Sequence, residues 1–238
     1  MYNKVNFEGT KNVVEACKRC SVKKLIMSSS PSTRMLGKYI DGFSEKELPS
    51  FDEMQGKFLQ AYAESKAKGE KYCLENCSDE FLTIAVAPHQ VYGPRDNLFL
   101  PNFLEASGLG KLRIFSKPGT GYGKNKVCFT HVDNYCHALI TAESKLTKES
   151  KCKGKFYIVT DAQTHPFKEG YAFFWDELSN AVEGVGFTSL HDKMKVPYWL
   201  LMSVAYVSAG IGKMIGQKFR LSVSFFRTFS FVNTFMCV

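Results

Sequence analysis

Residues 81–87 read Phe-Leu-Thr-Ile-Ala-Val-Ala, an uninterrupted apolar and β-branched run bounded by Asp79 and Pro88. Such a run is typical of a strand that is covered on both faces, as in the parallel sheets of α/β proteins. A second apolar run at 22–27 stops abruptly at Ser28-Ser29-Ser30-Pro31. The abrupt stop predicts a strand whose carboxyl end opens into a loop.

Two segments with the apolar spacing of amphipathic helices alternate with these runs. We predict one helix over residues 4–20 and a long helix from about Asp52 to Cys77, after a Pro-, Gly- and Ser-rich loop at 31–50. The order helix, strand, helix, strand is typical of βαβ units with right-handed crossovers. The fold class is therefore expected to be α/β with a parallel sheet.

The pattern loosens beyond Pro88. Further elements are expected as helices at 101–107, 133–146, 171–183 and 197–216, and as strands at 112–116, 126–130 and 155–160. We divide the chain into a catalytic domain at 1–160, with substrate-region insertions from about residue 95, and a substrate-covering, apolar region at 161–238.

The composition is that of a folded protein, with 238 residues, 45% hydrophobic content and a formal net charge of +8. These values exclude disorder, collagen-like repeats and small disulfide scaffolds. The lysines are spread along the chain without an RNA-binding aromatic signature or zinc-finger spacing, which argues against nucleic-acid binding. The first residues lack the pattern of a signal peptide, so we expect a reducing compartment.

The eight cysteines have two interpretations. Cys17-x-x-Cys20 has the spacing of a zinc or redox pair, but a zinc site needs four ligands, and Cys73-x-x-x-Cys77 lies on a predicted helix. Reduced thiols that pack as small apolar groups are the favoured interpretation. We therefore expect no metal site.

The stretch Tyr62-Ala-Glu-Ser-Lys66 carries the strongest chemical signal. Residues at i and i+4 of a helix leave the same face one turn apart. An ammonium group beside a phenol favours the phenolate, and an interaction of about 4 kcal/mol at about 4 Å would lower the tyrosine pKa substantially. The spacing alone occurs by chance in many proteins, so its context decides whether it is catalytic.

Two polar residues supply that context. Ser30 directly follows a predicted parallel strand, where open α/β sheets place their ligands, and its hydroxyl can orient a carbonyl or alkoxide oxygen. Asn6 lies inside a predicted helix, where asparagine is unfavourable unless its side chain has a particular partner.

Together these motifs resemble the short-chain dehydrogenase/reductase superfamily in its extended branch, and within it the 3β-hydroxysteroid dehydrogenase and sterol-4α-carboxylate 3-dehydrogenase group. The resemblance covers residues 1 to about 160. The motifs that carry it, in chain order, are Val5-Asn6-x-x-Gly9-Thr10, Ser28-Ser29-Ser30-Pro31-Ser32, Tyr62-x-x-x-Lys66, Pro88-His89-Gln90-Val91-Tyr92-Gly93-Pro94-Arg95-Asp96 and Phe129-Thr130-His131-Val132-Asp133-Asn134.

The resemblance implies the C-terminal part of a Rossmann-type doubly wound parallel sheet with a smaller, mostly helical substrate region. It also implies an NAD- or NADP-dependent oxidoreductase that acts on the 3β-hydroxyl group of a steroid or sterol. In this reading Tyr62 is the general acid and base, Lys66 lowers its pKa and holds the nicotinamide ribose, Ser30 positions the substrate oxygen, and Asn6 anchors a water next to Lys66.

The loop from Pro88 through His89 to Val91 would pass close to the nicotinamide amide. The family commonly has Arg-Pro where this chain has Ala87-Pro88, which weakens any detailed assignment in this loop. His89 and Arg95 are further candidates for substrate or cofactor contact. His131 and Asp133 have the residue types of an acid and base pair, but we interpret them as a strand-to-helix junction with Asp133 as the helix N-cap.

The extended branch also has a glycine-rich turn that holds the cofactor pyrophosphate at a helix N-terminus. Such a turn is expected upstream of Asn6, where this chain has only five residues. The glycines at 119–123 and at 210–216 lack the strand-turn-helix context. A fragment or truncated copy is therefore expected, and a catalytically inactive protein stays open beside it.

Residues 196–212 carry no charge, which as a helix spans roughly 25 Å, less than the ~30 Å of a bilayer core. Contact with a membrane surface through 196–238 and burial as a core helix are both open. The expected location is the cytoplasmic face of the endoplasmic reticulum membrane or the cytoplasm. A homodimer is open, and a nucleotide-sugar epimerase or reductase of the same superfamily is the alternative function.

Overall fold

The computed structural model describes residues 1–35, 40–101, 128–161, 180–181, 198–216 and 233–235. Its central sheet consists of β1 (Lys24–Ser28), β3 (Leu82–Pro88) and β6 (Phe156–Val159), which are parallel and lie in the order β1-β3-β6. The central strand β3 is the apolar run of the sequence, and its first six residues are buried. The predicted parallel α/β fold is therefore confirmed.

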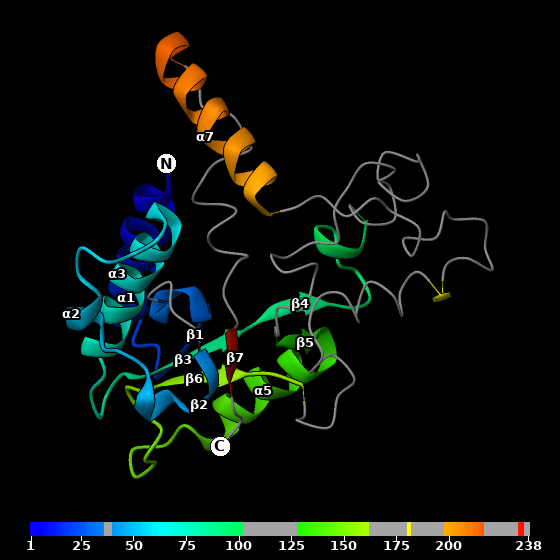
Figure 1. Ribbon diagram of the computed structural model, residues 1–238. Coiled ribbons are helices and arrows are strands. Elements are labelled where there is room, and N and C mark those ends of the chain that lie inside the picture. The colour runs from blue at the N-terminus through cyan, green and yellow to red at the C-terminus, as the bar shows by residue number, and fades with distance from the viewer. Residues whose placement is uncertain (36–39, 102–127, 162–179, 182–197, 217–232, 236–238) are drawn as a thin grey trace.

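Helices pack on both faces of this sheet (Figure 1). On one face, η1 (Asn3–Glu8), α1 (Gly9–Arg19) and α3 (Ala61–Glu75) lie together, and Val14 and Cys73 pack with Phe81 against Leu25 of β1. On the other face, α5 (Val132–Lys145) and the buried Leu146 that follows it pack against the alternate side chains of β1 and β3. The alternation of side chains along a strand thus feeds two separate apolar clusters, as a doubly wound sheet requires.

The helix predicted at 4–20 is present but begins with a π-helical segment, η1. The strands predicted at 22–27 and 155–160 correspond to β1 and β6, and the helices predicted at 133–146 and 197–216 correspond to α5 and α7 (Tyr198–Ile215). Among the described residues, no helix is both long and apolar enough to cross a bilayer.

The long helix predicted from Asp52 to Cys77 is wrong in its first third. The structure has a short helix α2 (Phe51–Met54), a turn, and then α3 from Ala61. Ser50 and Glu53 form a capping box that starts α2, and Gly56 has a φ of 71°, a conformation that ends a helix.

Several short elements were not predicted from the sequence. They are η2 (Pro31–Arg34), η3 (Glu45–Glu47), β2 (Ile40–Phe43), which pairs with β7 (Asn233–Phe235), and β4 (Gln90–Tyr92). The partner of β4 is β5 (Phe129–His131), which corresponds to the end of the strand predicted at 126–130. The interpretation of Asp133 as the helix N-cap is wrong, because α5 begins at Val132 and its N-cap is His131, whose side chain accepts from the Asp133 N–H at 3.3 Å.

The predicted strand at 112–116 lies outside the described residues, as do most of the predicted helices at 101–107 and 171–183. The same holds for residues 126–127 of the strand predicted at 126–130, for the glycines at 119–123 and for most of the proposed second region at 161–238.

Candidate active site

Tyr62, Lys66 and Ser30 meet at the carboxyl end of β1. Tyr62 lies in the first turn of α3 and Lys66 one turn later, while Ser30 lies in the loop between β1 and η2. The Ser30 side chain lies close enough to Tyr62 to influence the pKa of the phenol, and Lys66 Nζ donates to the Ser28 carbonyl oxygen at 2.9 Å. The helix and the strand end therefore bring a phenol, an ammonium group and a hydroxyl to one edge of the sheet.

The backbone around Ser30 explains how its hydroxyl is aimed. Ser30 is extended, with φ of −153°, and is the N-cap of η2, where its Oγ accepts from the Ser32 N–H at 3.3 Å. Its Oγ also lies 2.9 Å from Ser32 Oγ. These two contacts with Ser32 restrict the rotation of the Ser30 side chain within its own loop.

Burial shifts the pKa values of both Tyr62 and Lys66. Burial raises the pKa of Tyr62, and the hydrogen bond with Ser30 lowers it only in part. Burial lowers the pKa of Lys66, while the nearby carboxylate of Glu70 acts in the opposite direction. Desolvation of the phenol dominates the Tyr62 pKa, and the Lys66 ammonium bonds the Ser28 carbonyl oxygen. That Lys66 lowers the Tyr62 pKa stays a prediction.

Asn6 joins the first turns of the two helices. Its side-chain amide donates to Ser65 Oγ at 3.0 Å, and Ser65 Oγ in turn donates to the Tyr62 carbonyl oxygen at 2.8 Å. The Asn6 carbonyl oxygen accepts from Thr10 Oγ1 at 2.7 Å. Asn6 therefore supports the backbone under Tyr62, and a water between Asn6 and Lys66 stays a prediction.

The predicted cofactor loop follows the carboxyl end of β3. Pro88 ends β3 and Val91 lies in β4, where it pairs with Thr130. The His89 N–H donates to Thr130 Oγ1 at 2.9 Å. Arg95 is exposed and has a φ of 66°, in a turn beyond β4. These residues lie beyond the end of the central strand, and their contact with a cofactor or substrate stays a prediction.

Burial also determines the charge of His89. Both ring nitrogens are buried, and desolvation lowers the His89 pKa from its ordinary 6.5 to about 4, although a hydrogen bond with the Cys128 backbone opposes the shift. The ring is therefore neutral at physiological pH and cannot act there as a cationic partner for an anionic group.

This shift predicts a loss of stability in acid. A folded-state pKa below the unfolded value means that the unfolded chain binds more protons, so stability falls as the pH drops from about 6.5 to about 4. Glutamine does not titrate, so we expect the free energy of unfolding of His89→Gln to fall by about 2 kcal/mol less than that of the wild type over this pH range. Urea unfolding at each pH measures the difference. An unchanged pH dependence in the variant would show that His89 is not the responsible group.

One residue of this region was not predicted. Glu70 lies one turn beyond Lys66 on α3, is 1% exposed, and forms an ion pair with Arg34 of η2. Glu70 also accepts hydrogen bonds from Ser29 Oγ and Thr33 Oγ1. The only sequence signal for it is the spacing of Tyr62, Lys66 and Glu70 at i, i+4 and i+8.

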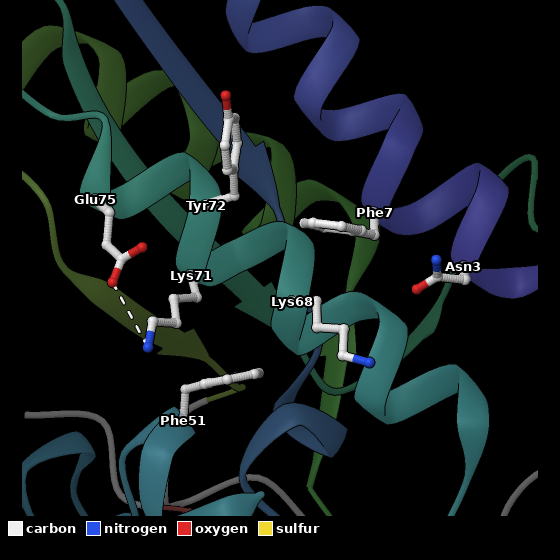
Figure 2. Close-up of a pocket in the computed structure, with 7 residues that line it drawn as sticks. All are labelled: Asn3, Phe7, Phe51, Lys68, Lys71, Tyr72 and Glu75. Atoms are coloured by element: carbon white, nitrogen blue, oxygen red, sulfur yellow. Dashed lines mark ion pairs between the residues drawn. The ribbon is translucent and has the colours of Figure 1, made fainter.

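A separate hollow of about 380 Å³ lies between η1, α2 and α3. Figure 2 shows its lining residues, which are Asn3, Phe7, Phe51, Lys68, Lys71, Tyr72 and Glu75. Its cations are already paired, because Lys68 lies 2.6 Å from Glu64 and Lys71 lies 2.7 Å from Asp52. It contains none of the predicted catalytic residues, so it is not the candidate active site.

The sequence matches one protein family over most of its length. The model of the 3-beta hydroxysteroid dehydrogenase/isomerase family matches residues 1–186. The chain belongs to this family. The predicted resemblance is confirmed, and with it the assignment to the short-chain dehydrogenase/reductase type of fold.

Named relatives agree with the family assignment. The chain is 35% identical over 202 residues to a bovine sterol-4-alpha-carboxylate 3-dehydrogenase, decarboxylating, covering 84% of this chain and 52% of the relative. It is 33% identical over 217 residues to the 3beta-hydroxysteroid-dehydrogenase/decarboxylase isoform 1 of Arabidopsis thaliana, covering 89% of this chain and 46% of the relative. The chain thus spans about half the length of these relatives.

Solved structures share the fold at low sequence identity. The crystal structure of gox2253 superposes with a TM-score of 0.62 at 19% identity, covering 97% of this chain and 63% of that one. A dTDP-glucose 4,6-dehydratase from Bacillus anthracis, solved in complex with NAD, gives 0.54 at 19% identity, covering 82% and 56%. Both confirm a Rossmann-type sheet for this family member.

The donor set at the end of β1 fits the hydroxyl-rich end of a dinucleotide. The half-buried Lys66 ammonium and the Tyr62 and Ser30 hydroxyls are hydrogen-bond donors that suit ribose hydroxyls and a reacting oxygen. Among the described residues, the glycines at 210–216 lie in or directly after α7, with no strand before them. These glycines therefore lack the strand-turn-helix context of a pyrophosphate site, and a cofactor bound by Tyr62, Lys66 and Ser30 stays a prediction.

Proposed function

We propose that this protein is an NAD(P)-dependent oxidoreductase that acts on the 3β-hydroxyl group of a steroid or sterol. The observation that carries the proposal is that Tyr62 and Lys66 of α3 and Ser30 come together at the carboxyl end of a parallel strand. Membership of the 3-beta hydroxysteroid dehydrogenase/isomerase family and relatives named for sterol oxidation support the choice of substrate.

In the proposed reaction, the Ser30 and Tyr62 hydroxyls bind the oxygen of the substrate. Tyr62 accepts the hydroxyl proton during oxidation and returns it during reduction. Lys66 binds the ribose hydroxyls, and Pro88, His89 and Val91 lie along the nicotinamide side. The bound nicotinamide supplies the hydride acceptor or donor.

The raised pKa of Tyr62 gives this chemistry a pH preference. The phenol is protonated at neutral pH, which suits donation to a carbonyl, whereas oxidation of the hydroxyl needs the phenolate. The rate of sterol oxidation is therefore expected to rise as the pH rises towards the Tyr62 pKa, and the rate of reduction to fall.

The direct test incubates the purified chain with NAD⁺ or NADP⁺ and a 4-carboxylated 3β-hydroxysterol, and follows reduction of the cofactor. Sterol-dependent reduction supports the proposal, and the better of the two cofactors gives the preference. A parallel reaction with a sugar nucleotide tests the alternative function. No reduction with any 3β-hydroxysteroid, together with turnover of the sugar nucleotide, would overturn the proposal.

We further propose that α7 contacts a membrane surface, which would place the protein at the cytoplasmic face of the endoplasmic reticulum membrane. Trp199, Val207 and Met214 on α7 are between 61% and 87% exposed. The net charge of +8 favours anionic headgroups, and a sterol substrate would itself reside in the bilayer. A homodimer stays a prediction.

Exchange of these three side chains for Ser is expected to lower the fraction of protein that floats with vesicles of phosphatidylcholine and phosphatidylserine by about tenfold, because a large apolar area is lost from the contact. Flotation at several salt concentrations separates the apolar from the electrostatic part. Equal flotation of the triple variant and the wild type would rule out α7 as the contact.

A further inference from the structure

We infer that Glu70 is a positioning residue, which fixes the loop that carries Ser30 onto the helix that carries Tyr62 and Lys66. This inference rests on the proposed function, since it concerns the same site. It assigns a role to a buried side chain whose hydrogen-bond partners are Ser29, Thr33 and Arg34.

The contacts of Glu70 lie on both sides of Ser30 in the chain. One carboxylate oxygen accepts from Ser29 Oγ and from Thr33 Oγ1, the latter at 3.3 Å, and the other is paired with the Arg34 guanidinium. Ser30 lies between these anchored residues. A single side chain of α3 therefore holds the loop before and after the residue whose hydroxyl meets Tyr62.

The loop is fixed from the sheet as well. The Ser29 N–H donates to the Val86 carbonyl oxygen of β3 at 2.9 Å, and the Arg34 guanidinium lies 4.5 Å from the centre of the Phe156 ring of β6. The side chains of Glu70 and Arg34 are 1% and 11% exposed. Because charges this deeply buried are held by several partners, the loop has little freedom to move relative to α3.

Glu70 also shares a helix face with the reacting groups. It follows Lys66 by one turn and Tyr62 by two turns of α3, and its carboxylate partly offsets the burial that lowers the pKa of the Lys66 ammonium. The distance between Ser30 and Tyr62 is therefore set within one rigid unit made of α3, the Ser28–Arg34 segment and the end of β1. Small misplacements of a substrate-orienting group lower rates strongly.

The first experiment compares Glu70→Gln with wild type in sterol oxidation. We expect kcat to fall by about 30-fold while the KM for sterol changes by less than about threefold, because the substitution displaces the Ser30 hydroxyl that orients the reacting oxygen and leaves the contacts to the rest of the substrate unchanged. Glu143→Gln is the matched control, since Glu143 also ties β1 to a helix, through Lys24 at 3.1 Å, but at the opposite end of the strand. Its kcat is expected to equal that of the wild type.

The decisive experiment is a double-mutant cycle that combines Glu70→Gln with Ser30→Ala. If Glu70 acts through Ser30, then Glu70→Gln causes no further loss of kcat once Ser30 is Ala. Multiplication of the two losses in the double variant would overturn the inference, because it would show that Glu70 affects the rate by another route. Ser29→Ala, which removes one partner of Glu70, is the milder second variant if Glu70→Gln does not fold.

A measurement without turnover separates this inference from the proposed function. NMR of protein labelled on the tyrosine rings can follow the titration of Tyr62. The Tyr62 signal is the one that disappears in the Tyr62→Phe variant. The hydrogen bond with Ser30 lowers the Tyr62 pKa, so Glu70→Gln and Ser30→Ala are both expected to shift the titration to higher pH. A shift in Ser30→Ala with none in Glu70→Gln or Ser29→Ala would contradict the inference whether or not the chain turns over sterol.

Discussion

Tyr62→Phe is expected to lower kcat for oxidation of a 3β-hydroxysterol by about 10³-fold, because the variant has no group at this position that can exchange a proton with the substrate oxygen. The ring itself is kept, so its edge contact with Tyr2, at 5.7 Å between ring centres, and the surrounding packing should persist. The KM for sterol is therefore expected to change little. Steady-state rates of cofactor reduction measure both quantities.

Tyr72→Phe is the matched control for this variant. Tyr72 lies on the same helix, but its hydroxyl donates to Glu15 at 2.7 Å, next to the hollow of Figure 2 and away from Ser30. Its removal should leave kcat unchanged. A Tyr62→Phe protein that retains more than about a tenth of the wild-type kcat would contradict the role of Tyr62, because general acid–base catalysis contributes at least about 10²-fold.

Gly69→Ala is expected to destabilise the protein by about 3 kcal/mol. A Cβ atom at this position of α3 would overlap the Asn6 carbonyl oxygen of η1 and approach Thr10 Oγ1 to 3.0 Å. The backbone oxygen cannot move without breaking the helix contact, so α3 and the η1–α1 segment would have to separate. Urea unfolding, read as a lower midpoint at an unchanged slope, measures the loss.

Gly210→Ala provides the comparison for Gly69→Ala. Gly210 lies in α7, and a Cβ atom there would meet nothing within 4 Å. We expect this variant to be neutral or more stable by up to about 1 kcal/mol, as for alanine in an open helical position. Equal stability changes in the two variants would show that the close approach of η1 to α3 is unimportant.

The sheet was predictable because its signal is local. An apolar, β-branched run such as 81–87 is continuous only where both faces are covered, and the side chains of β3 are indeed buried on both. By contrast, β4 and β5 are short strands of mixed polarity, and their pairing joins residues about forty positions apart. Such pairing depends on the tertiary fold, and residues 90–92 alone carry no signal for it.

The error at the start of α3 has a local cause that the sequence did contain. Phe58 and Leu59 continue the apolar spacing of a helix, which favoured one long element. Ser50 and Glu53 at capping-box spacing, followed by Gly56, indicated a separate short helix, and the structure uses both signals. Apolar spacing alone therefore located the helix but not its first residue.

The sequence allowed the residues of the candidate site to be predicted, but not the pKa shifts of their side chains. Ser30 and Tyr62 meet as expected, because a strand end and a helix start of a parallel sheet converge. The direction in which Lys66 extends depends on the Ser28 carbonyl, and the burial of Tyr62 depends on residues far away in the sequence. From the sequence alone, Glu70 would be expected on the surface. It is buried because it pairs with Arg34, which lies 36 positions earlier in the chain.

The central claim is that Ser30, Tyr62 and Lys66 serve hydride transfer from the carbon that bears the 3β-hydroxyl group. The most direct measurement uses a sterol with deuterium on that carbon and determines the mass of the nicotinamide cofactor after a single turnover. We predict deuterium in the reduced cofactor with wild-type protein and with Tyr72→Phe, and transfer slower by about 10³-fold with Tyr62→Phe. Deuterium that stays on the sterol, or that reaches the cofactor equally fast without the Tyr62 hydroxyl, would contradict the account.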